Sequence, residues 1–537
     1  IDFDEVLVHV GEKGKYQNIM YYLLCISATL PAAFLAFSQV FVSASPEHWC
    51  RIPELENLTG LMTLEERKAL SLPYVEKSDG KVKKYEKCKM YDVNYTAIVE
   101  SWLGNASREE GEDGAELDLV CDNSWWPSTS TTFFYVGSLF GNVVFGWIAD
   151  KWGRRTAFFA ILFLEVIFSI ATSFSPNYVI YTALRTVNGL SFPAIYQIPF
   201  ILALELMGPR YRTFAGMVIC MFFASAMSLL AVHWFTLSLA TSVPFVLLFS
   251  YYWIIPESPR WLLSKNRIDE AEVIVQRMAK INGKTVPNNF LVEILRRQGI
   301  SCNGTNSGDG SGEPAENEDR SPPPAATPMD LIRNPNIRKK FFILAFDWVA
   351  NAVVYNGLSY NATNLGVSDY LAFFIGGLVE IPSYVITWYA MDRLGRRWVL
   401  CLTMLLGGLA CVSCMFVPEE LKTRVCMCRT TDAVWVTVSL AMIGKFGIAA
   451  SFAVFYVFVG ELLPTVLRSQ AMGIASFIAG IGLLAFPYIV HLAVYSRVLP
   501  LIIMGTLSVA GALTSIFLPE TLNIHLPQTI EEGELFG

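Results

Sequence analysis

Long apolar stretches, separated by shorter polar segments, recur along nearly the whole chain. Each has about 20 residues, the length that an α-helix needs to cross the roughly 30 Å hydrocarbon core of a bilayer. A helical template matched to these stretches predicts twelve membrane-spanning helices, so we expect an all-α membrane protein. The predicted spans lie near 17–42, 130–149, 156–174, 178–206, 213–235 and 240–256, and near 341–360, 369–390, 398–416, 434–460, 470–493 and 497–518.

Two long polar segments interrupt the apolar pattern. Residues 43–129 carry three N-x-S/T sequons and three cysteines, which predicts an extracellular, glycosylated and oxidised loop. The second segment, 257–340, includes the Gly/Ser/Glu/Pro-rich stretch 303–327 and is typical of a cytosolic linker, so we expect its sequon at Asn303 to be unglycosylated. The extracellular sites predicted are glycosylation at Asn57, Asn94 and Asn105, with cysteines at Cys50, Cys88 and Cys121.

Basic residues in the short loops predict the orientation of the chain. Cytosolic loops of membrane proteins carry an excess of Lys and Arg. The loop arginines all fall on the side opposite the sequons, which places both termini in the cytosol. The predicted domains are an N-terminal bundle (1–256), the linker (257–340), a C-terminal bundle (341–520) and a cytosolic tail (521–537). These arginines are Arg154, Arg155, Arg210, Arg212, Arg260, Arg393, Arg396, Arg397 and Arg468.

Composition agrees with a membrane protein and excludes several other classes. Hydrophobic residues make up 53% of the chain and charged residues 16%, against roughly a quarter charged in soluble domains. The net charge of −7, with basic clusters only at helix ends, predicts no nucleic-acid partner. The cysteine pattern predicts no metal site and we expect no cofactor. The polar first 16 residues lead directly into an apolar stretch, so we expect no cleavable signal peptide.

Three short motifs occur twice, in the same order, at corresponding ends of the predicted spans. DKWGRR at 150–155 returns as DRLGRR at 392–397, and PES at 256–258 returns as PET at 519–521. A Glu followed seven residues later by an Arg closes both the fourth and the tenth span. The repetition predicts two duplicated six-helix halves.

The repeated residues have the chemistry of a gate. Carboxylates at helix ends accept hydrogen bonds from arginines and from backbone N–H groups of a neighbouring helix, and such networks hold only while the cytosolic ends are together. The alternative is that the arginines only satisfy the positive-inside rule. We favour the gate for the paired set: Asp150, Gly153, Arg154, Arg155, Glu205 and Arg212, and Asp392, Gly395, Arg396, Arg397, Glu461 and Arg468.

These motifs resemble the major facilitator superfamily, whose loop signature G-x-x-x-D-x-x-G-R-R is matched from Gly146 to Arg155. LVCD at 119–122, PESPRWL at 256–262, VEIP at 379–382 and ELLPTVLR at 461–468 are similar to the organic cation, anion and zwitterion transporters of solute carrier family 22. AFLAFSQVF, FDWVANAVVYNGLSY and LPQTIEEGE look most like its invertebrate organic cation and carcinine transporters. Sugar porters share DxxGRR and PESPR but lack the loop at 43–129, so they rank second.

The resemblance implies a fold, a location and several details. It implies two six-helix bundles around a central cavity that opens alternately to each side. It also implies a plasma-membrane protein that works as a monomer, with a Cys88–Cys121 disulfide and no usual partner for Cys50. A uniporter for a cation is favoured over proton coupling, for which buried carboxylates such as Glu165 and Glu380 are candidates.

Aromatic and charged residues inside the spans are the candidates for binding substrate. Trp348 and Tyr355 match the family's aromatic contacts in the seventh span, and Tyr196 is a further match; such rings attract an ammonium by cation–π interaction. A charge within a span is costly, which directs attention to Asp347, Glu380, Glu165, Lys445 and His233. Most aromatics in such a chain simply pack or face lipid, and His233 reads as structural.

The charged candidates are assigned different roles. Asp347 is the preferred counter-ion for an amine, although it lies near the cytosolic start of its span and snorkelling is the alternative. Glu380 matches a family carboxylate, and Lys445 either pairs with a buried carboxylate or attracts the acidic end of a zwitterion. Asn351, in the same predicted span, is also a candidate substrate-binding residue. Gly480 aligns with the position where cation carriers hold Asp and anion carriers hold Arg, which suits zwitterions or amines and weakens an anion assignment.

Three functions compete at this point. The first is a carrier of small organic cations or zwitterions, and the second is a transport-dead sensor that binds a ligand through the loop at 43–129. A membrane enzyme has no support, because the chain has no Walker-type phosphate loop, no HExxH and no GxSxG. We expect a transporter that is not an enzyme.

Overall fold

The computed structural model of the chain describes most of its length. The described residues are 3–11, 13–42, 63–76, 83–85, 91, 123–192, 194–208, 211–230, 243–287, 290–297, 329–417, 429–463, 465–522 and 530–536. The predicted sequons, the loop cysteines Cys50, Cys88 and Cys121, and His233 lie outside them.

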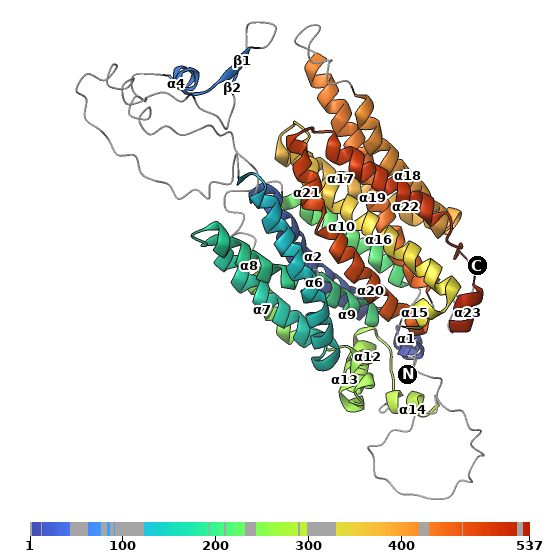
Figure 1. The fold of residues 1–537 in the computed structure, drawn as a ribbon. Coiled ribbons are helices and arrows are strands. Elements are labelled where there is room, and N and C mark those ends of the chain that lie inside the picture. Colours follow the sequence, from blue (N-terminus) through green and yellow to red (C-terminus); the bar gives the residue numbers. More distant parts are fainter. Residues whose placement is uncertain are drawn as a thin grey trace, which may run out of the picture.

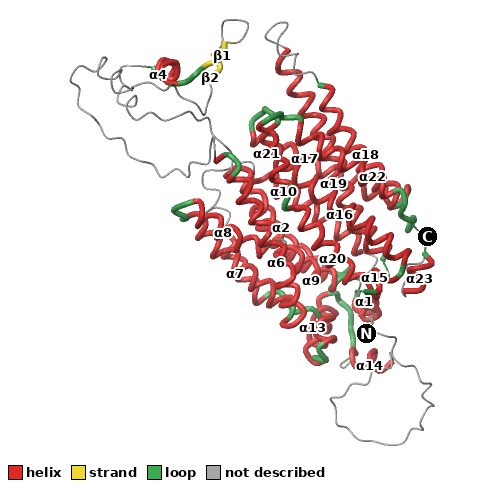
Figure 2. Tube along the Cα trace, in the orientation of Figure 1, coloured by secondary structure: helices red, strands yellow, loops and turns green. Residues whose placement is uncertain are grey.

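The described residues form a bundle of long helices (Figures 1 and 2). The N-terminal half contains α2 (Lys15–Val42), α6 (Trp126–Trp152), α7 (Arg154–Ser173), α8 (Tyr178–Ser191), α9 (Ala194–Glu205), α10 (Arg212–Leu230) and the 3-10 helix η3 (Val243–Trp253). The C-terminal half contains α16 (Pro335–Tyr360), α17 (Asp369–Leu394), α18 (Arg396–Ser413), α19 (Arg429–Leu462), α20 (Thr465–Leu483), α21 (Phe486–His491) and α22 (Leu499–Ser515).

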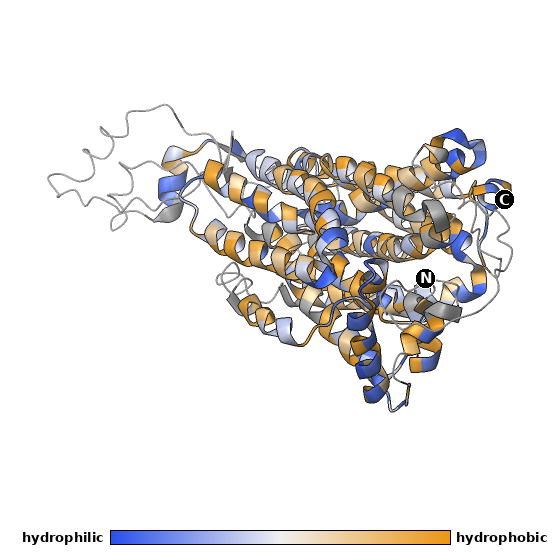
Figure 3. Cartoon of the chain, turned by 90° about the horizontal axis from the view of Figure 1, so that it is seen from below, coloured by the Kyte–Doolittle hydropathy of each residue, from blue (hydrophilic) through white to orange (hydrophobic). Residues whose placement is uncertain are grey.

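Shorter elements lie outside the bundle. These are α1 (Phe3–Val10), α4 (Leu64–Ser71), the antiparallel strands β1 (Tyr74–Glu76) and β2 (Lys83–Tyr85), α12 (Pro259–Ser264), α13 (Ile268–Ile281), α14 (Phe290–Arg297), α15 (Asp330–Arg333) and α23 (Ile530–Leu535). Figure 3 shows the long helices carrying mainly hydrophobic residues, with hydrophilic residues concentrated in short segments towards the ends of the molecule.

The described helices follow the predicted spans in order, with three local differences, one of which is the division of the predicted span 470–493 into α20 and α21. In the described part of the chain, eight helices are long and apolar enough to cross a membrane, and Ala215–Ala226 and Leu499–Ser515 are shorter apolar helices. The predicted span 178–206 is divided into α8 and α9: Phe192 is extended, as a residue before a proline prefers to be. The described part of the predicted span 240–256 forms a 3-10 helix rather than an α-helix.

The two chain termini lie at one end of the bundle, which we call the terminal end; the opposite end is the far end (Figure 1). At the terminal end, α1, α12, α13 and α14 bury a small hydrophobic cluster of their own. Asn282 connects this cluster to the start of α2: its side-chain oxygen accepts from the Tyr16 backbone N–H at 3.0 Å, and its nitrogen donates to Gln17 at 2.9 Å. The first membrane helix is thereby held against α13.

The halves meet along α10 with α17 and along α6 with α20 and α21. Among the described residues, hydrogen bonds cross this interface near the far end. Tyr360 donates to the carbonyl of Ala36 (2.5 Å), Tyr135 donates to Asn356 Oδ1 (3.1 Å), and Thr132 donates to the carbonyl of Leu484 (3.4 Å). Residues of α2 and α6 therefore belong to the same hydrophobic core as the C-terminal half.

Candidate functional site

A buried ion pair lies inside the C-terminal half. Lys445 Nζ of α19 is 2.9 Å from Glu380 Oε1 of α17, and their side chains are 4% and 0% exposed. The hydroxyl groups of Tyr355 and Tyr384 both donate to Glu380 Oε2 at 3.0 Å. Lys445 also donates to Ser359 Oγ. Of the two roles predicted for Lys445, pairing with a buried carboxylate is confirmed.

The ion pair needs these partners because it is removed from water. A carboxylate or ammonium in a low-dielectric interior is strongly disfavoured unless an opposite charge and further hydrogen bonds satisfy it. The Lys445 ammonium additionally lies 3.7 Å from the centroid of the Tyr355 ring. Tyr355, predicted to stack on a substrate amine, thus already holds a cation that belongs to the protein.

An aromatic cluster extends from this ion pair. Tyr355 stacks on Phe452, with ring centroids 5.3 Å apart and planes at 21°, and Phe452 contacts Tyr456 at 5.2 Å. Trp348 packs edge-on against Tyr456 at 5.6 Å. Tyr196, from the N-terminal half, neighbours Tyr456. The structure therefore brings the three predicted aromatics into one cluster shared by both halves.

Asp347 and Asn351 lie on another side of α16. Asp347 is fully buried, and its two carboxylate oxygens accept hydrogen bonds from Thr514 (2.8 Å) and Ser515 (2.7 Å) of α22. Asn351 accepts a hydrogen bond from Ser451 at 2.5 Å. The structure does not bring Asp347 to the aromatic cluster: it connects α16 to α22, whereas Trp348 faces α19.

Gly480 lies where the two halves touch. A Cβ atom added at Gly480 of α20 would come within 2.6 Å of Leu139 Cδ1 of α6. The absence of a side chain therefore lets α20 approach α6 closely. A charged residue at this position would have to displace the flexible end of Leu139.

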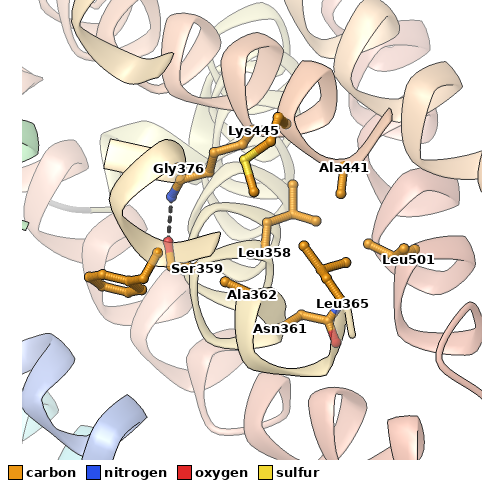
Figure 4. Close-up of a pocket in the computed structure, with 11 residues that line it drawn as sticks. Leu358, Ser359, Asn361, Ala362, Leu365, Gly376, Ala441, Lys445 and Leu501 are labelled. Carbon is orange, nitrogen blue, oxygen red and sulfur yellow. Dashed lines mark hydrogen bonds between the residues drawn. The ribbon is translucent and has the colours of Figure 1, made fainter. Parts of the chain in front are cut away.

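A small pocket adjoins the ion pair (Figure 4). Leu358, Ala362, Leu365 and Met442 supply apolar walls, and Lys445 and Ser359 supply polar groups. Its free volume suffices for about one water molecule, so it is too small for an organic solute. In this conformation the ion pair is closed to substrate.

The sequence analysis missed a buried charge inside a predicted span, Arg185 of α8. Its residue exposure is 6%, its Nη2 donates to the Leu35 carbonyl of α2 at 3.1 Å, and its guanidinium lies 4.7 Å from the Phe134 ring centroid. An arginine inside a predicted apolar span was the available signal. Glu165 of α7, which the sequence did single out, is 3% exposed, and its Oε2 has no hydrogen-bond partner among the described residues.

The repeated motifs form matching clusters at the terminal end of each half. In the first, Glu257 Oε1 accepts from the backbone N–H groups of Arg154 (2.9 Å) and Arg155 (3.2 Å), the first residues of α7. In the second, Glu520 accepts from Arg396 (2.8 Å) and Arg397 (3.2 Å), the first residues of α18. A carboxylate at a helix N-terminus satisfies N–H groups that have no partner within the helix.

Burial affects the first of these carboxylates. Desolvation raises the pKa of Glu257 above its usual value, while the hydrogen bonds from the backbone N–H groups of Ser258, Arg155 and Arg154 act in the opposite direction. Neither Glu257 nor Glu520 was among the predicted gating residues, although the repeated PES and PET motifs contain them. The signal was the Glu of the motif, placed directly after the sixth and twelfth predicted spans.

The motif arginines bind a second carboxylate in each cluster. Arg154 Nε is 3.5 Å from Glu205 Oε1, and Arg396 Nε is 3.1 Å from Glu461 Oε2. Asp150 pairs with Arg154 at 3.1 Å. The side chain of Asp392 is exposed, and those of Arg212 and Arg468 lie outside the described part of the chain.

These contacts join helices of the same half: α6, α7 and α9 with the segment after η3, and α17, α18 and α19 with the segment after α22. The sequence analysis expected networks that hold only while the cytosolic ends are together. In the structure, the contacts of these networks join helix ends within one half.

Comparisons with known proteins agree with this geometry. Residues 77–532 match the family model described as sugar (and other) transporter. The chain is 38% identical to the carcinine transporter of Drosophila melanogaster over 100% of its own length and 79% of that protein. It is 38% identical to organic cation transporter 1 of Caenorhabditis elegans, covering 100% of this chain and 89% of that one.

Two further similarities place the family and the fold. Solute carrier family 22 member 21 of Mus musculus is 33% identical over 99% of this chain and 93% of its own. The partially occluded inward-open xylose transporter XylE from E. coli superimposes with a TM-score of 0.58 at 14% identity, covering 95% of this chain and 100% of that one. The multi-pass helical bundle, its duplicated clusters and these matches agree: the chain belongs to the sugar (and other) transporter family of the major facilitator superfamily and, within it, to solute carrier family 22.

Proposed function

We propose that the chain carries small organic cations and zwitterions across the plasma membrane by alternating access, with both termini in the cytosol. The observation that supports this most is the Glu380 carboxylate, which is fully buried beside a cluster of aromatic rings. A buried carboxylate next to aromatic faces suits an organic ammonium, because both groups attract a cation more strongly when water is excluded. Relatives named for carcinine and for organic cations support the same substrate class.

Binding would proceed by exchange at the ion pair. Lys445 now occupies the place of a cation, with Glu380 on one side and the Tyr355 ring on the other. When the site opens, a substrate ammonium replaces Lys445 at Glu380, and the displaced Lys445 ammonium is released towards Ser359. Glu380 stays paired with a cation throughout the exchange, and the displaced Lys445 ammonium is hydrated by water that enters the open site, so neither charge is left buried and unpaired.

Glu380 thereby takes the place that the sequence assigned to Asp347 as the counter-ion. The hydroxyl groups of Thr514 and Ser515 already satisfy Asp347, and it lies away from the aromatic cluster. We assign Asp347 to the packing of α16 on α22. Trp348, Tyr355 and Tyr196 remain the proposed aromatic contacts, and Gly480 the proposed neutral position that admits both cations and zwitterions.

The two-half architecture supports the transport cycle. We propose that residues 1–256 and 341–520 move as two bodies joined by 257–340, with 521–537 as a tail. The clusters around Glu257 and Glu520 act in gating by keeping the terminal ends of each half together as the halves move. Charge neutralisation of a cation needs no proton, so a uniporter driven by the membrane potential is the favoured mode.

Uptake in cells tests the proposal. Cells expressing the chain are given labelled tetraethylammonium, carcinine, carnitine and an organic anion, and uptake is compared for the unaltered chain, Glu380→Gln and Asp347→Asn at matched surface expression. We expect amine uptake that Glu380→Gln abolishes and Asp347→Asn reduces much less. Uptake of the anion alone, or no uptake at normal surface expression, contradicts the proposal, and loss in Asp347→Asn with uptake kept in Glu380→Gln returns the counter-ion to Asp347.

The predicted extracellular loop has its own tests. We propose glycosylation at Asn57, Asn94 and Asn105 and a disulfide between Cys88 and Cys121. Deglycosylation is expected to shift the electrophoretic mobility of the unaltered chain but not that of a triple Asn→Gln variant. Non-reducing peptide mapping that finds Cys88 or Cys121 as a free thiol contradicts the disulfide.

A further inference from the structure

Arg185 is a buried cation whose charge the protein does not neutralise with a carboxylate. Its residue exposure is 6%, and no acidic side chain of the described residues forms an ion pair with it. Its partners are the Leu35 carbonyl at 3.1 Å and the face of Phe134, and its buried Nε has no hydrogen-bond partner in the described part of the chain. A guanidinium inside a membrane span is expensive, so such residues generally serve a ligand or an ion pathway.

The position of Arg185 adds a second argument. Phe134, the ring that covers the guanidinium, contacts the ring of Tyr135 at 5.3 Å, and the rings of Tyr135 and Tyr360 both pack against Phe486 at 5.2 Å. These two tyrosines make the hydrogen bonds that join the halves near the far end, to Asn356 (3.1 Å) and to the Ala36 carbonyl (2.5 Å). We call this hydrogen-bonded part of the interface between the halves the seam, and Arg185 lies behind it. If the halves part at the far end, the guanidinium becomes exposed to a solute that enters from that end.

From these observations we propose that Arg185 binds the carboxylate of a zwitterionic substrate, as a subsite separate from the Glu380 carboxylate that takes the ammonium. A guanidinium presents a planar fork of N–H donors that matches a carboxylate, and the free Nε supplies one donor of that fork. An amino acid-like solute then meets a fixed positive charge in the N-terminal half and a fixed negative charge in the C-terminal half. A simple cation uses only the second.

The inference rests on the proposed function and narrows its substrate class. The structure also explains why the subsite is closed in the present conformation: Phe134 stacks on the guanidinium, and Leu35 occupies Nη2. A carboxylate arriving after the seam opens accepts from Nε and from an Nη group, in exchange for the Leu35 carbonyl. Both the guanidinium and the carboxylate keep their charge, and no proton moves.

A matched pair of substrates separates recognition from folding. β-Alanine is a zwitterion, and β-alaninamide has the same skeleton and ammonium but no carboxylate. KM and maximal uptake of both are measured for the unaltered chain, Arg185→Gln, Arg185→Lys and Phe134→Leu at matched surface expression. Arg185→Gln removes charge-assisted hydrogen bonds to the carboxylate, so it is expected to raise the KM of β-alanine about tenfold or more. The KM of β-alaninamide stays within about twofold by the same reasoning.

The variants give distinct outcomes. Arg185→Lys is expected to fall between the unaltered chain and Arg185→Gln, because it keeps the charge and loses the planar fork. Phe134→Leu, which removes only the stacked ring, is expected to leave the β-alanine preference in place. If Arg185→Gln reduces the uptake of both substrates equally, the inference is overturned and Arg185 has only a structural role in holding α8 against α2. An unchanged KM for β-alanine also overturns it.

The outcome for the proposed function remains separate. If the unaltered chain takes up β-alaninamide but not β-alanine, the carboxylate subsite is refuted while cation transport stands. If it takes up neither these nor any other amine at normal surface expression, the proposed function itself fails.

Discussion

Gly153 and Gly395 show why a motif position accepts one residue type. Both adopt a backbone conformation that is accessible essentially only to glycine. Gly153 has φ of 103° and ψ of 158°, and Gly395 has φ of 89° and ψ of 165°. A Cβ atom at Gly395 would lie 2.5 Å from Glu520 Oε2. The glycine thus allows the sharp turn into α18 and leaves room for the carboxylate that binds its first N–H groups.

Replacing this glycine is expected to weaken the fold. Gly395→Ala adds backbone strain of about 1–3 kcal/mol and pushes Glu520 away from α18. The purified protein in detergent should show a lower thermal unfolding midpoint. Gly473→Ala is the control, because an added Cβ there meets no atom within 4 Å and its φ is ordinary. Equal midpoints for the two variants would refute this account.

The Glu380–Lys445 pair supports a second residue-scale prediction. Lys445→Met leaves a buried carboxylate without its cation, which destabilises proteins by about 3–5 kcal/mol. The double variant Glu380→Gln with Lys445→Met removes both charges and is expected to recover most of the lost stability, while remaining unable to take up amines. Thermal unfolding of the four proteins in the cycle measures the coupling, and additive effects of the two substitutions would contradict it.

At the scale of elements, the same capping device recurs in both halves. The carboxylate after the sixth helix of each half binds the first N–H groups of the third helix, so α7 begins against Glu257 and α18 against Glu520. The duplicated sequence therefore encodes a duplicated contact between elements far apart along the chain.

Neutralising this carboxylate tests the element-scale account. Glu520→Gln keeps the shape of the side chain and removes its charge, and each charge-assisted hydrogen bond lost is worth about 1.5–3 kcal/mol. Glu257→Gln is expected to have a similar effect on thermal unfolding, because the geometry is repeated. Glu531→Gln, at an exposed position of α23, serves as the control. A large loss in one half with none in the other would argue against equivalent roles.

At the scale of the whole molecule, hydrogen bonds between the halves near the far end define the conformation. Tyr135 with Asn356 and Tyr360 with Ala36 hold that end together. In the proposed alternating-access cycle, this seam has to part before a solute can enter from the far end.

Locking the seam is expected to stop transport. In the double variant Tyr135→Cys with Asn356→Cys, a short bifunctional thiol reagent that releases its link under reduction should abolish amine uptake, and reduction should restore it. Each single variant, treated in the same way, controls for reaction with the native cysteines. Uptake that continues with complete cross-linking would show that the halves do not separate there.

The sequence predicted most of the fold because its signals are local. Spans long enough to cross a bilayer must be helical, since lipid leaves no other partner for backbone N–H and C=O groups. The break between α8 and α9 was not predicted, although the proline at 193 favours one. The 3-10 form of η3 was also missed, because hydrophobicity alone does not distinguish between helix types.

The candidate site was predicted in part, for a physical reason. The sequence singled out Trp348 and Tyr355 by their match to the family's aromatic positions in the seventh span. It singled out Glu380 and Lys445 because charged residues are conspicuous in apolar spans. It favoured Asp347 over Glu380 as the counter-ion, because neighbours in sequence were read as neighbours in space. Around α16, Asp347 and Trp348 point to different helices, α22 and α19, and only the packed bundle decides this.

By itself, the sequence determined that this is a duplicated, multi-pass helical membrane protein of the transporter class, because span length, repeated motifs and charge placement are properties of local segments. Only the tertiary structure decided which charges are neutralised and by what. Glu380 meets Lys445 from another helix, Glu257 and Glu520 reach helices far away in sequence, and Arg185 is left without a carboxylate among the described residues. Ion pairing depends on distance in space, and helix packing sets that distance.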